Sequence, residues 1–196
     1  MMVSQCQAKL LHQLTLLLRP RRVLEIGTFT GYSTIAMASA LESAATITTL
    51  ELDQRPLQIA HQYIQKAGLN DIVEMKQGPA IESLIQLTRE RPNLQYDMIF
   101  LDADKGGYIQ YYEHIMQHNL LSDRGCLLAD NVLFFGQVHR EAGYIDPQPV
   151  EASKNIKKTA RKAHAFNAHV YSDPRAQVVV LPLFDGLSII QKRKKD

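Results

Sequence analysis

The chain has 196 residues, of which 45% are hydrophobic and 21% are charged, and its formal net charge is +2. This length and composition predict one globular domain over residues 1–196, and the charge is too small to indicate nucleic-acid binding by itself. No apolar run is long enough for a membrane span, and we expect no interaction with membranes. Cys6 and Cys126 show no paired spacing and no signal peptide precedes them. We therefore expect a soluble protein of the reducing cytoplasm.

Apolar strands and amphipathic helices alternate along most of the chain. The first expected helix is leucine-rich and runs from Leu10 to Leu18. The strands expected after it are Val23 to Ile26, Thr46 to Leu50, Ile72 to Met75, Met98 to Leu101 and Gly125 to Ala129. The further expected helices are Tyr32 to Leu41, Pro56 to Ala67, Pro79 to Thr88, Tyr108 to His118 and Val150 to Ala168.

The C-terminal segment departs from this alternation. Val178 to Leu181 and Leu187 to Gln191 are typical strands, and the PLFDG between them is a hairpin signal. The whole pattern predicts an α/β fold with a doubly wound, mostly parallel sheet that gains one antiparallel strand near the C-terminus. In such sheets, ligands bind at the carboxyl ends of the strands.

The first expected strand carries an acid in an unusual place. Glu25 lies inside the apolar segment VLEIG, where a buried charge needs a partner, either an arginine such as Arg22 or a cationic ligand. The following turn has only Gly27 and Gly31, so it lacks the G-x-G-x-x-G of dinucleotide sites. An ammonium group, such as that of S-adenosylmethionine, would suit Glu25. Glu51, after the second strand, would suit ribose hydroxyls, although it could also be a solvated acid.

A second polar group follows the fourth and fifth strands. Asp102 in FLDADK and the pair Asp130 and Asn131 in LLADN should converge, because these strands are expected to be neighbours. Two carboxylates and an amide oxygen suit Mg²⁺, with Ca²⁺ and Mn²⁺ as alternatives, better than zinc. The structural alternative is a strand-to-loop turn at Asp130 and Asn131 and a helix cap at Asp102.

Seven segments, taken in order, resemble one family. They are VLEIGTFTGYS, LELD, GPA, LDADKGGY, ADNVLFFGQV, DPR and LPLFDGLSI. This set is similar to the cation-dependent O-methyltransferases typified by catechol and caffeoyl-CoA O-methyltransferases. The resemblance implies a Rossmann-like seven-stranded sheet and a homodimer. It also implies methyl transfer from S-adenosylmethionine to a hydroxyl of a small catechol-like or hydroxylated phenylpropanoid acceptor.

The same resemblance implies roles for individual residues. Those implied to bind S-adenosylmethionine are Val3, Glu25, Gly27, Thr28, Ser33, Glu51, Pro79, Ala80, Asp102 and Asp104. Asp102, Asp130 and Asn131 are implied to hold a divalent cation that activates and orients the acceptor. Lys105 matches the family's lysine and is expected to act as the base beside Asp102, with a pKa lowered by nearby positive charge. Its alternative roles are a solvated charge or an ion pair with Asp104.

Two features differ from the family pattern. The additional N-terminal helical segment of the family is expected to be absent, which implies a partial chain or an unusually open acceptor site. Phe134 and Phe135 stand where plant enzymes often have a tryptophan and a substrate-binding asparagine. This difference argues against a plant-type acceptor preference.

Two alternative functions stay open. Five basic residues share one face of the last expected helix, namely Lys154, Lys157, Lys158, Arg161 and Lys162. They could contact RNA phosphates, and some bacterial relatives methylate a hydroxyuridine in transfer RNA. Ile156, Ala160 and Ala163 form an apolar opposite face, so a solvated helix is the simpler interpretation. A nucleoside-binding module without catalysis is the alternative from another class.

Overall fold

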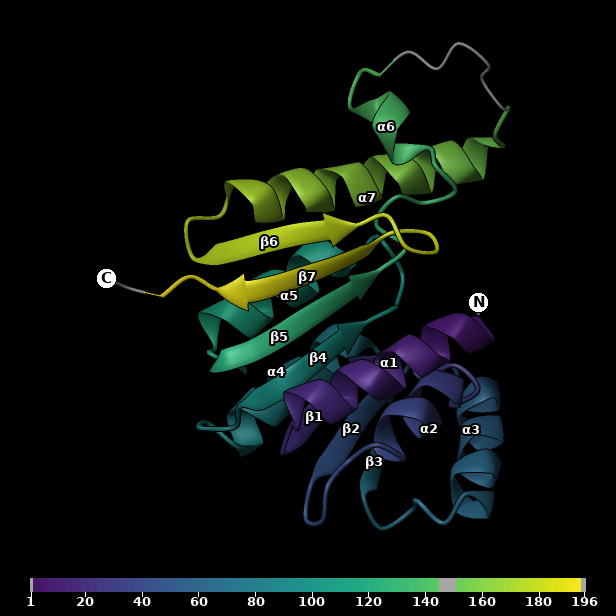
Figure 1. Ribbon diagram of the computed structural model, residues 1–196, viewed down its shortest axis with the longest axis vertical. Helices are drawn as coiled ribbons and strands as arrows, with labels where there is room; N and C mark the ends of the chain where they lie inside the picture. Colours follow the sequence, from purple (N-terminus) through teal and green to yellow (C-terminus); the bar gives the residue numbers. More distant parts are fainter. Residues whose placement is uncertain (1, 145–150, 195–196) are drawn as a thin grey trace.

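A single seven-stranded sheet organises the computed structural model, which describes residues 2–144 and 151–194 (Figure 1). Its strands are β1 (Arg22–Ile26), β2 (Thr46–Glu51), β3 (Val73–Gln77), β4 (Tyr96–Leu101), β5 (Leu121–Asp130), β6 (Ala176–Leu181) and β7 (Leu187–Lys192). They lie in the order β3-β2-β1-β4-β5-β7-β6. Strands β1 to β5 pair in parallel, and β7 runs antiparallel to both β5 and β6. The predicted fold class is confirmed, including its one antiparallel strand.

Helices cover both faces of the sheet (Figure 1). They are α1 (Gln5–Leu18), α2 (Tyr32–Ala38), α3 (Gln54–Lys66), α4 (Ala80–Glu90), α5 (Tyr108–Gln117), α6 (Val138–Glu141) and α7 (Lys154–Ser172). Helices α1, α2 and α3 pack with Val23 of β1, whereas α4, α5 and α7 pack with Leu24 and Ile26. These three side chains are fully buried, so β1 is enclosed on both faces, as a central parallel strand should be. None of the helices in the described ranges has the length and hydropathy needed to span a bilayer.

The first helix begins earlier than the prediction from Leu10. It starts at Gln5 because the Ser4 hydroxyl caps it, accepting a hydrogen bond from the Gln7 N–H (3.2 Å). This extra turn contains Gln7, which contacts Asp130 at the end of β5, and it follows Val3, which lies near the carboxyl ends of the strands.

Other boundaries also differ. Strand β5 begins at Leu121 rather than Gly125, because Leu121 pairs with Tyr96 across an irregularity in the β4–β5 register. Helix α7 runs from Lys154 to Ser172 instead of from Val150 to Ala168, and Ser153 caps it. Val150 itself lies outside the described residues. The short helix α6 was not predicted, and the remaining boundaries agree with the prediction or differ from it by at most three residues.

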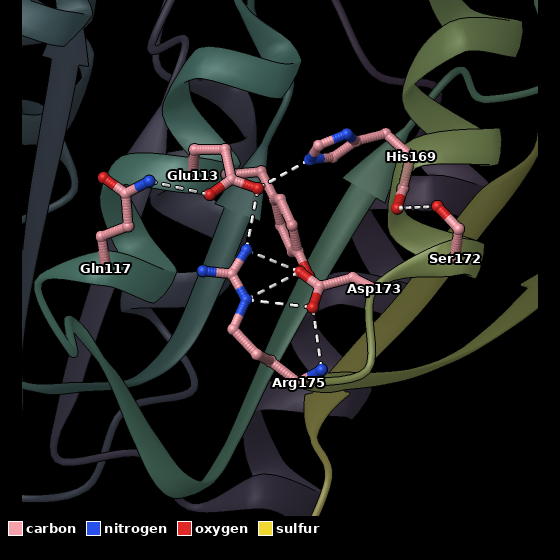
Figure 2. A network of polar contacts seen from close by, with 7 residues as sticks. Glu113, Gln117, His169, Ser172, Asp173 and Arg175 are labelled. Atoms are coloured by element: carbon pink, nitrogen blue, oxygen red, sulfur yellow. Dashed lines mark hydrogen bonds and ion pairs between the residues drawn. The ribbon is translucent and has the colours of Figure 1, made fainter.

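A charged network joins the end of α7 to α5 and β6 (Figure 2). Arg175, from the DPR segment, donates from Nε and Nη2 to the carboxylate of Asp173 (2.7–3.0 Å). Its Nη2 also donates to Glu113 Oε1 (2.8 Å), which lies 2.7 Å from His169 Nε2. Tyr112 donates a further bond to Asp173 (2.7 Å). These bonds lower the pKa of Asp173 to about 2. The DPR segment therefore fixes the junction between helix and hairpin.

Replacing Arg175 by alanine should lower the free energy of unfolding at pH 7 by about 1.5–3 kcal/mol, because two carboxylates lose charged hydrogen bonds. The pKa of Asp173 is depressed in the folded state, so its stabilising effect is present above about pH 4 and is lost as the pH falls towards 2. The difference between wild type and Arg175→Ala should therefore shrink from pH 7 to pH 3. Urea unfolding measures it, with Arg89→Ala as an exposed control. A difference independent of pH would contradict the assignment.

Candidate functional site

The carboxyl ends of β1, β2 and β4 surround a cavity of about 310 Å³. Its shape depends on Gly27, which follows β1 with a φ of 109°. A Cβ at this position would lie 2.3 Å from the backbone oxygen of Asp102 at the end of β4. Because only glycine permits both this conformation and this approach, the end of β4 closes directly against the turn after β1.

Most of the residues predicted to bind a ligand here do line this cavity. They are Val3, Gly27, Thr28, Ser33, Glu51, Pro79, Ala80, Asp102 and Asp104. Glu25 is not among the lining residues. The sequence did not predict some of the residues that line the cavity, including Met2, Phe29 and Tyr111. Tyr111 had no recognisable signal, because its place in the wall follows from how α5 packs rather than from a local pattern.

Glu25 is fully buried, and its partners within the chain are three side-chain hydroxyls. The hydroxyls of Ser33 (2.6 Å), Thr34 and Thr49 (2.6 Å) donate to its carboxylate. The alternative pairing with Arg22 is wrong, because Arg22 lies exposed at the start of β1. Burial raises the pKa of Glu25 to about 7, although the three hydrogen bonds act in the opposite direction. Glu25 thus stands behind Ser33, which lines the cavity.

Glu51 is half-buried, and two backbone N–H groups hold its carboxylate. Its Oε2 accepts a hydrogen bond from the Phe29 N–H (2.7 Å), and its Oε1 accepts one from the Asp53 N–H (3.0 Å). The carboxylate therefore joins the loop after β1 to the loop after β2, and its oxygens remain at the wall of the cavity. This arrangement holds two acceptor atoms in place for a ligand with neighbouring hydroxyl groups.

A second cavity, of about 480 Å³, shares part of its wall with the first. Residues 102–104 line both cavities. Lys105 and Asn131 continue the wall of the second one, and Phe134 and Phe135 form an aromatic side with ring centroids 5.1 Å apart. The two cavities therefore meet at the carboxyl end of β4.

Lys105 is 8% exposed, and its ammonium group is held by neighbouring oxygens. It donates to the Tyr108 hydroxyl and to Asn131 Oδ1 (3.3 Å), and it lies 3.8 Å from Asp102 Oδ1. The predicted alternative, an ion pair with Asp104, is wrong. The pKa of Lys105 is lowered, and the cause within the chain is burial, which the nearby carboxylates oppose. The predicted cause, the charge of a bound cation, stays a prediction. The sequence prediction also missed Tyr108, which lies at the start of α5 and positions this lysine.

The three oxygen donors predicted to bind a cation lie together at the ends of β4 and β5. Burial, and then the charge of Asp130, raise the pKa of Asp102 to about 7. Asp130 is 1% exposed, and Gln7 Nε2 donates to its Oδ2 (2.5 Å). Its Oδ1 accepts the N–H of Asn131 (2.8 Å), so the local turn of the structural alternative is present as well. Gln7 gave no signal in the sequence, because 123 positions separate it from its partner.

The donor set is compatible with a hard divalent cation. Burial raises the pKa of both Asp102 and Asp130, and the charge of Asp130 raises that of Asp102 further, so a positive ion would stabilise the charged forms. The amide oxygen of Asn131 completes an all-oxygen set. Within residues 2–144 and 151–194, no group of three or more His, Cys, Asp or Glu side chains is arranged to hold a metal ion. The predicted set differs from such a group because its third donor is the amide of Asn131.

The chain is similar to known methyltransferases over nearly its full length. A family model described as O-methyltransferase matches residues 1–193. Caffeoyl-CoA O-methyltransferase 2 of Populus trichocarpa is 30% identical over 195 residues, covering 99% of this chain and 76% of the relative. The SAH-bound structure of the Podospora anserina methyltransferase PaMTH1 has a TM-score of 0.88 at 30% identity, covering 98% and 80% of the two chains. An O-methyltransferase from Bacillus cereus in complex with SAH has a TM-score of 0.84 at 30% identity, covering 98% and 83%.

Replacing Glu25 by glutamine should change how stability depends on pH. The pKa of Glu25 is raised from 4.5 to about 7 on folding, so its contribution to stability is lost as the pH rises from about 4.5 to 7. Glutamine does not titrate, so the stability of Glu25→Gln relative to wild type should rise over that pH range. The expected change in the difference between their free energies of unfolding is on the order of 2 kcal/mol. Urea unfolding across this pH range measures the change, with the exposed Glu42→Gln as control. An unchanged difference between pH 5 and pH 8 would show that Glu25 titrates normally.

Proposed function

Because this chain belongs to the O-methyltransferase family and uses S-adenosylmethionine, we propose that it methylates a hydroxyl of a small catechol-like or hydroxylated phenylpropanoid acceptor with the help of a divalent cation. The observation that carries this proposal is the pair of cavities that share residues 102–104. A methyl donor in one cavity and a hydroxyl in the other would meet at that wall. The homodimer stays a prediction from the family resemblance, and the cytoplasmic location stays a prediction from the cysteine usage.

The first cavity supplies groups suited to S-adenosylmethionine. In our proposal Glu51 accepts hydrogen bonds from the ribose hydroxyls, and Val3 and Ser33 lie at the methionine end. Glu25 acts through other side chains, since Ser33 and Thr49 donate to it and Thr49 lies 2.5 Å from the Thr28 hydroxyl. The buried acid thereby orients hydroxyls that face the ligand.

Asp102, Asp130 and Asn131 would hold the divalent cation, with Mg²⁺ as the first choice and Ca²⁺ or Mn²⁺ as alternatives. Their all-oxygen character and the raised pKa values of the two acids support this proposal. When bound, the cation would lower the pKa of the acceptor hydroxyl and fix its orientation.

Lys105 is placed to take the proton of the acceptor hydroxyl. Its pKa is lowered by burial, which increases the share of the neutral amine that can act as a base. The Tyr108 hydroxyl holds its Nζ at the wall of the second cavity, and Tyr108 in turn donates to the backbone oxygen of Leu101 (2.9 Å). Phe134 and Phe135 give that cavity an apolar side, next to a reaction in which a sulfonium and an oxyanion lose their charges.

The basic face of α7 does not require an RNA acceptor. Ala160 and Ala163 on its opposite face are buried, and Ile156 is half-buried, as expected for a helix with one solvated side. Arg161 already pairs with Glu141 (3.7 Å).

Methyl transfer from labelled cofactor to parallel pools of small diols and transfer RNA tests the choice between the two kinds of acceptor. Label found only in the RNA would overturn the proposal of a small acceptor. Cofactor binding without turnover of either pool would favour the nucleoside-binding module.

Replacing Glu51 by alanine should weaken binding of S-adenosylhomocysteine by about 1.5–3 kcal/mol, because ribose hydroxyls would lose a charged acceptor. Calorimetric titration measures the affinity, and Glu42→Ala, which removes an exposed acid, should leave it unchanged. Glu51→Gln keeps one acceptor oxygen and should fall between the two. Equal affinities for wild type and Glu51→Ala would exclude Glu51 from the binding site.

Removal of divalent cations should abolish methyl transfer while leaving the affinity for S-adenosylhomocysteine nearly unchanged, since the proposed ligands serve the acceptor more than the cofactor. Added Mg²⁺ should restore transfer to wild type but not to Asp130→Asn. Labelled methyl transfer and calorimetry give the two readouts. Full activity after thorough chelation would rule out the cation-assisted reaction.

A further inference from the structure

We propose that Lys162 and Thr159 form an anion-binding end of the second cavity, so that the preferred acceptors carry a carboxylate beyond the reacting diol. Both residues belong to α7, one turn apart on the same face, and both line this cavity. This inference rests on the proposed function and narrows its substrate class.

Lys162 reaches across the cavity to the loop that follows β4. Its Nζ lies 2.7 Å from the position that a Cβ would take at Gly106, next to Lys105. The absence of a side chain at Gly106 leaves the room that the ammonium group occupies. A residue on α7 thereby places a positive charge at the wall that β4 and its loop form.

Among the described residues, Lys162 takes part in no ion pair. Its neighbour Arg161 pairs with Glu141 on the side of α6. Asp104 is close, with Oδ2 at 3.1 Å from the same Cβ position at Gly106. Its oxygens already accept hydrogen bonds from the Tyr111 hydroxyl (2.8 Å) and the Gly107 N–H (2.9 Å). The ammonium group of Lys162 is therefore available to a ligand.

The charges of the cavity orient an acidic acceptor in one direction. In the proposed function Asp102 helps to hold the cation that takes the diol, and Lys105 is already engaged by Asn131 and the Tyr108 hydroxyl. The part of the wall between α7 and Gly106 offers the ammonium of Lys162 and the hydroxyl of Thr159, which together provide donors for the two oxygens of a carboxylate. Phe134 and Phe135 line the same cavity and suit an aromatic ring.

A volume of about 480 Å³ suits one aromatic ring with a short acidic arm. The order of groups along such an acceptor would be diol, ring and carboxylate. Each part then meets a matching part of the cavity: the oxygen donors and Lys105, the aromatic side, and the anion-binding end.

A matched pair of acceptors tests this assignment. 3,4-Dihydroxybenzoate and 3,4-dihydroxybenzamide differ mainly in charge, so the ratio of their kcat/KM values reports on the anion-binding end. Lys162→Met should lower kcat/KM for the benzoate by about five- to tenfold, as expected for one partly exposed charged contact, and should leave the benzamide within about twofold. Lys158→Met is the control, because Lys158 is exposed on the same helix and does not line the cavity; it should change neither value.

Reversing the charge of residue 162 gives an independent test, because the preference between acidic and basic acceptors should reverse as well. Lys162→Glu should favour 3,4-dihydroxybenzylamine over the benzoate, whereas wild type should favour the benzoate. Affinity for S-adenosylhomocysteine and the thermal midpoint should match wild type in each variant, which shows that folding and the first cavity are intact. An unchanged benzoate-to-benzamide ratio in Lys162→Met overturns the inference and leaves the proposed function standing. Failure of wild type to methylate any of the three diols overturns both.

Discussion

The close contact between the backbone of Gly27 and the carbonyl oxygen of Asp102 sets the geometry on which the rest of the site depends. Strands β1 and β4 pair in parallel with Ile26 opposite Leu101, so the chain leaves both strands at the same level. With no side chain at Gly27 to separate them, the segment of residues 102–104 faces one cavity on each side. A single short stretch of backbone can thus align two ligands, and small displacements of reacting atoms are costly to a transfer reaction.

Around this contact the protein buries several ionisable groups that an ordinary core would exclude. Glu25 is supported by three hydroxyls, Lys105 by a tyrosine and an amide, and Asp130 by Gln7. In each case the ionisable group and its partner belong to different helices, strands or loops. These polar groups lie between two apolar layers, which supply the stability that the site itself does not.

The sequence predicted features that depend on local patterns and on the topology of a parallel sheet. Polar residues that directly follow strands, such as Glu51 and Asp102, were predicted because the carboxyl ends of parallel strands meet at one edge. The partners of Glu25 were not predicted, because the strand pattern of β1 shows burial but cannot distinguish a cation from hydroxyls on α2 and β2. The lowered pKa of Lys105 was predicted, but the contribution of burial to it was not, because the degree of burial depends on Tyr108 and the packing of α5.

The bond between Gln7 and Asp130 has a consequence for the order in which the chain folds. The residues that line the first cavity all precede residue 112, so most of its wall is made before β5 leaves the ribosome. The first turn of α1, which adjoins Val3, nevertheless gains its side-chain anchor only when Asp130 is in place. Contacts so distant in sequence form late, because a long loop must close first. The N-terminal half of the chain alone therefore lacks the bond that ties the start of α1 to the end of β5.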